Sequence, residues 1–138
     1  MKGQSLIIQF LVFFLIGFSL FISIGTFFKY QSDLFRDEIT SSSIKLANSY
    51  ISSNIITLLK NCKQCDTATI STSISNLTAG EAIQINLSSS GLNTSMPTKY
   101  FNSPVHNLNY SLAFSGKSYS FKPITLTFDK NQNILEVS

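Results

Sequence analysis

Apolar residues are concentrated at the beginning of this chain. Residues 6–28 are nearly all Leu, Ile, Val or Phe, and the run is interrupted only by Gln9, Gly17, Ser19, Ser23, Gly25 and Thr26. At about 1.5 Å per residue, a helix over this run covers a hydrocarbon layer of roughly 30 Å. The pattern predicts a membrane-spanning helix rather than a buried core helix, because so small a protein has little to surround it with.

The pattern changes after residue 28, but it remains helical. Apolar residues now recur every three to four positions, at Phe35, Ile39, Leu46, Ala47, Ile51, Ile55, Leu58 and Leu59. No Pro or Gly lies between Thr26 and Lys60, although the Thr-Ser-Ser-Ser run at 40–43 favours a bend or a new helix cap. If the helix is unbroken, residues 4–60 form one element of about 85 Å.

From residue 67 the apolar period becomes two, which indicates β-strands. We expect strands within 81–88, 109–114, 118–123, 124–128 and 134–137, turns at 115–117 and 129–133, and a loop over 88–97. Five to seven antiparallel strands would form a head over residues 61–138 that packs on the outer half of the helix. The predicted fold class is α+β: a long apolar helix followed by a small antiparallel sheet or sandwich.

Charge sets the expected orientation in a membrane. The formal net charge is +3. Lys2 and the terminal amine precede the apolar run, whereas the residues that follow it sum to −1: Lys29, Asp33, Arg36, Asp37 and Glu38. The positive-inside rule then places the N-terminus in the cytoplasm and everything after residue 30 outside.

The two cysteines form a single Cys62-Lys-Gln-Cys65 motif. A structural zinc site needs about four ligands, and the chain has no second cysteine pair and only one histidine, His106. An exterior location favours a small disulfide loop, with two free thiols as the alternative.

The exterior part also contains four Asn-x-Ser/Thr sequons, at Asn76, Asn86, Asn93 and Asn109. Such sequons are acceptors for N-glycosylation in exported proteins. The alternative is that they are simply part of a strand and turn sequence rich in hydroxyl groups.

Catalytic chemistry is not predicted. One histidine, seven scattered carboxylates and no Gly-rich phosphate loop leave no set of residues for an active site. The few basic residues are spread out, which argues against nucleic-acid binding. We therefore expect no enzyme activity, no cofactor and no metal.

The first residues resemble the class III signal of archaeal type IV prepilins. That resemblance rests on Lys2-Gly3 followed by Gln4 and the long apolar helix. It implies that a membrane-embedded prepilin peptidase removes residues 1–3 and that the helix is kept. Residues 4–28 would then anchor the subunit and later form the filament core, residues 29–60 would form the amphipathic outer half, and the head would face the exterior.

The resemblance also implies partners: identical or homologous pilin subunits, the peptidase and an assembly platform. The small, hydroxyl-rich head is similar to those of Sulfolobales pilins and of their UV-inducible pili, which mediate cell aggregation and DNA exchange, with surface glycans of other cells as expected contacts. One departure concerns the fifth mature position. Many type IV pilins have Glu there, whereas this chain has Ile8, and the neighbouring Gln9 offers only hydrogen bonds.

Small residues in the apolar run are expected to mark close helix–helix contacts. Ser19 and Ser23 have small-xxx-small spacing, and Gly17 and Gly25 flank them. Two alternatives to a pilin remain: an uncleaved anchored binding protein resembling an archaellum stator, and a secreted protein cut before Thr26, because Ser23 and Gly25 suit conventional signal peptidase.

Overall fold

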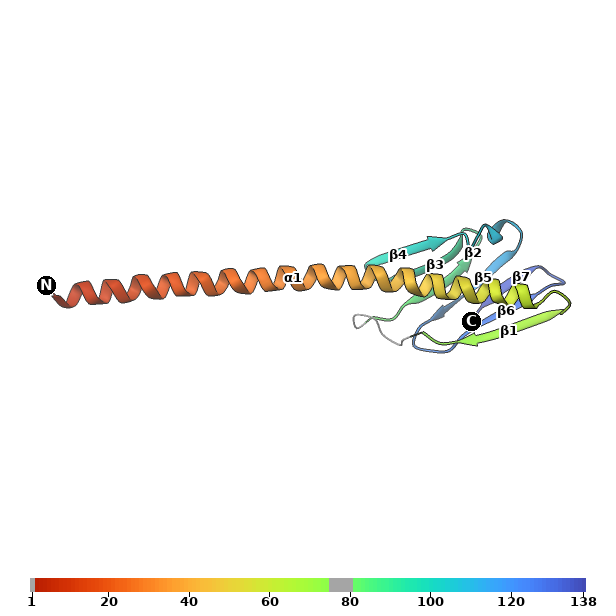
Figure 1. Cartoon of the computed structure of the whole chain (residues 1–138), viewed down its shortest axis with the longest axis horizontal. Coiled ribbons are helices and arrows are strands. Elements are labelled where there is room, and N and C mark those ends of the chain that lie inside the picture. Colours follow the sequence, from red (N-terminus) through yellow and green to blue (C-terminus); the bar gives the residue numbers. More distant parts are fainter. Residues whose placement is uncertain (1, 75–80) are drawn as a thin grey trace. The chain divides into compact units, whose positions relative to one another are not determined.

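The computed structural model describes residues 2–74 and 81–138, except for the side chains of 2–5, and divides the chain into two compact units, 1–38 and 39–138. One α-helix, α1 (Lys2–Asn61), contributes to both units (Figure 1). The helix continues through the hydroxyl-rich run at 40–43, where no Pro or Gly interrupts it. A seven-stranded, mostly antiparallel sheet follows, which confirms the predicted α+β class.

The strands of the second unit are β1 (Thr67–Thr72), β2 (Gln84–Ser88), β3 (Gly91–Met96), β4 (Lys99–Ser103), β5 (Ala113–Tyr119), β6 (Ile124–Asp129) and β7 (Ile134–Val137). Their order in the sheet is β1-β6-β7-β5-β2-β3-β4. All neighbouring strands are antiparallel except β5 and β7, which are parallel. The antiparallel head expected from the sequence therefore contains one parallel pair, β5 and β7, in the middle of the sheet.

The predicted turn at 115–117 is also wrong, because these residues lie inside β5. Residues 113–116 of β5 pair with β7, and residues 117–119 pair with β2. Gly116 sits where the partner changes and has φ 105°, a conformation that suits glycine. A Cβ added there would collide with the Val137 carbonyl oxygen, so glycine also permits a close approach to β7.

Three other predicted segments differ from the structure. The expected strand at 118–123 contributes only its first two residues to β5, because the chain turns after Tyr119, where the Lys122 amide donates to the Tyr119 carbonyl at 3.2 Å. The expected loop at 88–97 contains β3, which is joined to β2 by a tight hairpin that ends at Gly91 with φ 112°. The expected strand at 109–114 contributes only its last two residues to β5, because Leu108–Tyr110 form a 3-10 helix. By contrast, β6, the turn after it and β7 agree with the alternating pattern.

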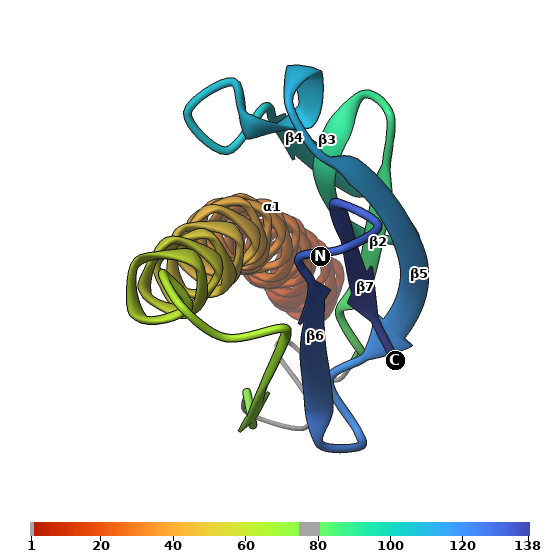
Figure 2. The same ribbon diagram turned by 90° about the vertical axis from the view of Figure 1, so that its right-hand side faces the viewer.

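The core of the second unit lies between one face of α1 and the sheet, which curves around this half of the helix (Figure 2). The helix contributes Ile44, Ala47, Ile51, Ile55 and Leu58, all at most 4% exposed. Opposite them are the inward residues of the strands, among them Ile85, Leu87, Leu92, Leu126 and Leu135. The helical periodicity identified most of this face, but it missed Ile44 and included Ile39 and Leu46, which are exposed.

Candidate functional site

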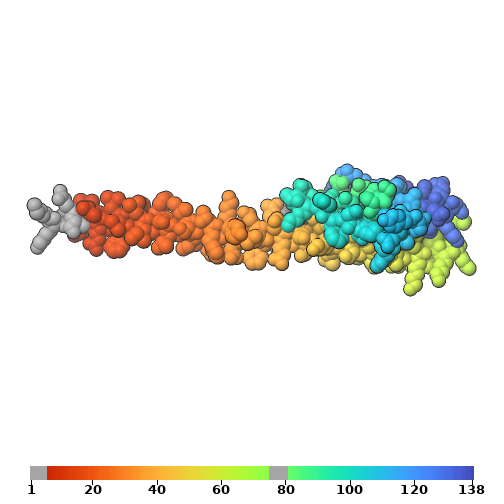
Figure 3. All heavy atoms as spheres, turned by 90° about the horizontal axis from the view of Figure 1, so that it is seen from above, coloured from red at the N-terminus to blue at the C-terminus, as the bar shows by residue number. Residues whose placement is uncertain are grey.

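The main feature of the first unit is a fully exposed apolar helix. From residue 6 to residue 38 every side chain is exposed except that of Gln31, which is half-buried. Figure 3 shows one face of this segment as a continuous row of side chains in red to orange. We call the large apolar side chains between Leu6 and Phe28 the apolar helical surface. By length and composition, α1 is suited to cross a membrane.

Two of the three hydroxyl groups between Leu6 and Phe28, those of Ser23 and Thr26, bond to the helix itself. Ser23 Oγ donates to the Ser19 carbonyl at 2.9 Å, and Thr26 Oγ1 lies 3.0 Å from the Ile22 carbonyl and 2.9 Å from that of Ser23. A hydroxyl that bonds to a preceding carbonyl presents little unpaired polarity to lipid or to an apolar partner. The hydroxyl groups of Ser23 and Thr26 therefore add little polar cost to the apolar helical surface.

The four predicted packing residues lie on two faces of the helix. Successive helical residues are about 100° apart, so Ser19 and Ser23 share one face while Gly17 and Gly25 lie on the opposite one. A Cβ added at either glycine meets nothing within 4 Å. The structure therefore separates these small residues into two pairs, each open to an external partner.

The predicted peptidase-recognition residues, Lys2, Gly3 and Gln4, belong to the first turns of α1. Their side chains are outside the described part of the structure. At the other end of the apolar helical surface, Lys29, Asp33, Arg36, Asp37 and Glu38 are all exposed.

Cys62 and Cys65 form a disulfide immediately after α1. The loop that it closes contacts the turn between β6 and β7: Lys130 Nζ donates to the Lys63 carbonyl at 2.9 Å, and the Lys130 amide donates to the Asp66 carbonyl at the same distance. The disulfide therefore lies where the end of the helix is tied to the sheet.

The sequons occupy different environments. Asn86 and Asn93 lie directly opposite each other on β2 and β3, half-buried on the face of the sheet that points away from α1. Asn109 belongs to the 3-10 helix, where its Nδ2 donates to the Ser89 carbonyl at 3.1 Å and its Oδ1 is buried. The predicted site at Asn76 lies outside the described residues.

Among residues 2–74 and 81–138, no three His, Cys, Asp or Glu residues are gathered in a group that could hold a metal ion. His106 is exposed in a stretch in which Val105, His106 and Asn107 all have positive φ, between 47° and 63°. This stretch borders a groove of about 660 Å³, which is lined by six residues of α1, four of them with hydroxyl groups, and by residues 101 and 103–107.

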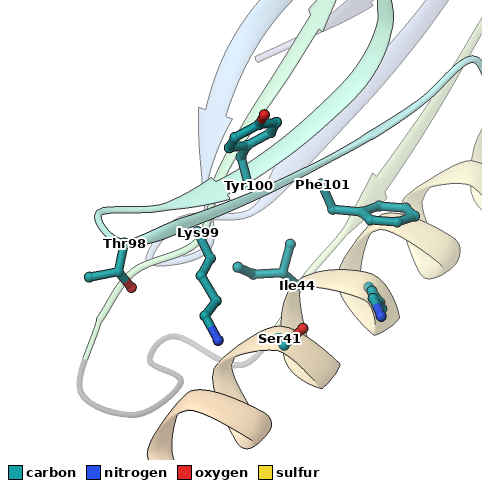
Figure 4. A pocket seen from close by; sticks show the side chains of 7 residues that line it. Ser41, Ile44, Thr98, Lys99, Tyr100 and Phe101 are labelled. Carbon is teal, nitrogen blue, oxygen red and sulfur yellow. The ribbon is translucent and has the colours of Figure 1, made fainter.

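Sequence reasoning missed a small pocket beside α1 (Figure 4). It is lined by Ser41, Ile44, Lys45, Thr98, Lys99, Tyr100 and Phe101. These residues come from the helix, from the turn between β3 and β4, and from β4. No local motif joins them, because only the packing of β4 beside the helix brings the two lysines to one place.

Comparisons with protein families, with curated proteins and with solved structures find no match to this chain.

Proposed function

We propose that this chain is a subunit of a type IV pilin-like filament, anchored in a membrane by α1 before it polymerises through the same helix. The single observation that carries the proposal is the apolar helical surface, which is exposed throughout in the isolated chain. In water each Å² of this surface costs about 25 cal/mol, so it requires either lipid or the helices of other copies. The second unit requires neither, since residues 39–138 enclose a core of their own.

The position of the small residues supports assembly with more than one neighbour. Close approach of helices in lipid depends on small residues, and here they lie on two opposite faces. A single dimer interface uses one face of a helix, whereas a helix enclosed in a filament contacts copies on several sides. Repetition of a contact between two different faces extends into a helical polymer.

The same polymer would carry its heads on the outside, and we propose that they serve in surface adhesion or cell–cell aggregation. The observation that favours this is a pocket of about 400 Å³ in which Tyr119 and Phe121 stack at a ring distance of 5.3 Å beside Gln84 and Ser95. Aromatic rings next to amide and hydroxyl groups suit the apolar faces and hydroxyl groups of surface glycans. Replacing Phe121 by Ser should then reduce aggregation of cells without reducing the number of filaments.

The experiment that tests the filament proposal is N-terminal sequencing of the mature protein, combined with electron microscopy of material sheared from cells. A mature protein that begins at Gln4 and is present in filaments supports the proposal. A protein that begins at Met1 and stays in the membrane supports an anchored, non-polymerising binding protein. A start at Thr26 supports secretion of the head alone.

A substitution at Gly3 tests the proposed cleavage by a prepilin peptidase separately. Replacing Gly3 by Val should block processing, leave Lys2 attached and abolish filaments, because a prepilin peptidase reads the basic-Gly pair. Normal processing and normal filaments in this variant would contradict the class III assignment.

A further inference from the structure

The pocket in Figure 4 has the size and composition of a site for one acidic side chain. Its volume is about 250 Å³. That is below the range of about 300–1,000 Å³ that is usual for small-molecule sites. Among the described residues that line it, two are lysines and none is acidic.

The two ends of the pocket differ in chemistry. Ile44, which is 2% exposed, and the half-buried Phe101 provide apolar surface. Lys99 extends from β4 toward the helix near the hydroxyl group of Ser41 (Figure 4). Lys45 is exposed and makes no hydrogen bond or ion pair with any described residue. A carboxylate on a short apolar stem matches this arrangement, and glutamate has that structure.

We propose that Glu38 of a second copy of this chain occupies the pocket and pairs its carboxylate with Lys45. This inference rests on the proposed filament, in which helices of neighbouring copies run side by side. Glu38 is exposed and, like Lys45, has no hydrogen bond or ion pair with any described residue. The partner's anion and this pocket's cation are therefore both available for a contact between copies.

Charge balance favours an acid of the segment 29–38, and within it the longer side chain of Glu38 reaches further than that of Asp33. The second unit, residues 39–138, has seven lysines and four acidic residues, which gives 7 − 4 = +3, whereas the segment 29–38 sums to 2 − 3 = −1. Glu136 is exposed on the face of the sheet away from α1, where it cannot meet a helix that is packed beside Lys45. Asp37 already has an interaction within its own chain.

The position of Glu38 along the helix explains why it would need to pair with Lys45. Glu38 follows the apolar helical surface, and assembly would cover that surface with other copies. A carboxylate near the edge of such a zone loses water, and it becomes costly unless a cation replaces that water. Lys45 of the next copy supplies this cation, and lower solvent access strengthens the pair relative to an exposed one.

A charge-swap experiment in the full-length chain tests the proposal. Lys45→Glu and Glu38→Lys should each lower the yield of sheared filaments by about tenfold, since the pair becomes repulsive. The double variant should restore most of the yield. Lys122→Glu and Glu136→Lys make the same charge changes at exposed positions away from the pocket, and they should leave the yield within about twofold of wild type.

Cross-linking supplies an independent readout. Because both native cysteines form one disulfide, cells that make two chains, one with Lys45→Cys and one with Glu38→Cys, should form disulfide-linked dimers within filaments. Chains with Lys122→Cys and Glu38→Cys should not. These dimers would report proximity of the two positions even if a charge-reversed head were poorly folded.

The outcomes separate this inference from the proposed function. If wild-type protein forms no filaments, the proposed function fails, and this inference fails with it. If wild type forms filaments but the double variant is not rescued and no cross-link forms, the filament proposal stands and the Glu38 contact is wrong. Loss of filaments in Lys45→Glu with normal yield in Glu38→Lys would assign the pocket to another anion and overturn the proposal.

Discussion

Asn48 on α1 and Thr94 on β3 form a buried hydrogen bond of 2.9 Å between the helix and the sheet. The same Asn48 Nδ2 lies 3.1 Å from the Leu92 carbonyl, and both side chains are almost completely buried. Apolar contacts tolerate small sliding of a helix over a sheet, whereas a buried amide with two acceptors does not. This pair therefore fixes the position of the helix along β3.

Replacing Asn48 by Leu should lower the free energy of unfolding of the head by about 1–3 kcal/mol, because the Thr94 hydroxyl loses its buried partner. Denaturant unfolding of the detergent-solubilised full chain measures this. The matched control is Asn54→Leu on the same helix: its amide donates to the Tyr50 carbonyl in an exposed hydrogen bond, so the change should be below about 0.5 kcal/mol. Equal losses in the two variants would show that Asn48 has no special role.

Gly116 should not tolerate a larger residue. Gly116→Ala places a Cβ against the Val137 carbonyl oxygen at φ 105°, so we expect a loss of at least about 2 kcal/mol in the free energy of unfolding. Gly17→Ala is the control, because nothing lies within 4 Å of its added Cβ and Ala favours a helix. A head that unfolds at the same denaturant concentration in both variants would contradict the close approach of β5 and β7.

Several elements could be predicted from the sequence because their signals are local. The apolar run and the absence of Pro and Gly before Lys60 indicate a long helix, and the alternation in 124–128 and 134–137 indicates two strands. The strand assignment is wrong near Gly91 and Gly116 because glycine is typical of turns. Gly116 instead lies inside a strand that changes its pairing partner. That exchange depends on strands distant in the sequence.

The candidate functional features also differ in whether a local sequence signal predicts them. The apolar helical surface follows directly from composition. The lysine pocket does not, because Lys45 and Lys99 are far apart in the chain and become neighbours only when β4 packs beside the helix. Similarly, nothing in the sequon sequence distinguishes Asn109, whose amide is bonded within the head, from Asn86 and Asn93 on the outer face.

The two pairs of small residues should act on different contacts within the filament. Ser19→Leu and Gly25→Leu should each reduce filament yield while the protein still inserts in the membrane, since each blocks close approach on one of two opposite faces. Counting filaments against the membrane-bound pool measures this. Phe21→Leu, which changes an apolar side chain without adding bulk, is the control. Normal yield from leucine variants at Gly17, Ser19, Ser23 and Gly25 would show that these residues are only tolerated.

Glycans should be attached to Asn86 or Asn93 on the outer face of the sheet and not to Asn109. Asn86→Gln or Asn93→Gln should remove mass from the mature protein, whereas Asn109→Gln should not, because Asn109 Nδ2 is already used in a hydrogen bond to Ser89. Intact mass spectrometry and peptide mapping check both statements. A modified Asn109, or a wild-type protein with the bare polypeptide mass, would contradict them.

The position of β7 has a consequence for how the head is made. This strand is the last of the seven in chain order, yet it lies between β5 and β6 inside the sheet. While synthesis has not passed residue 137, β6 and β1 have no strand to connect them to the rest of the sheet. The head can therefore complete its folding only after the ribosome has made all seven strands. The apolar helix leaves the ribosome much earlier, so lipid or a chaperone must cover it in the meantime.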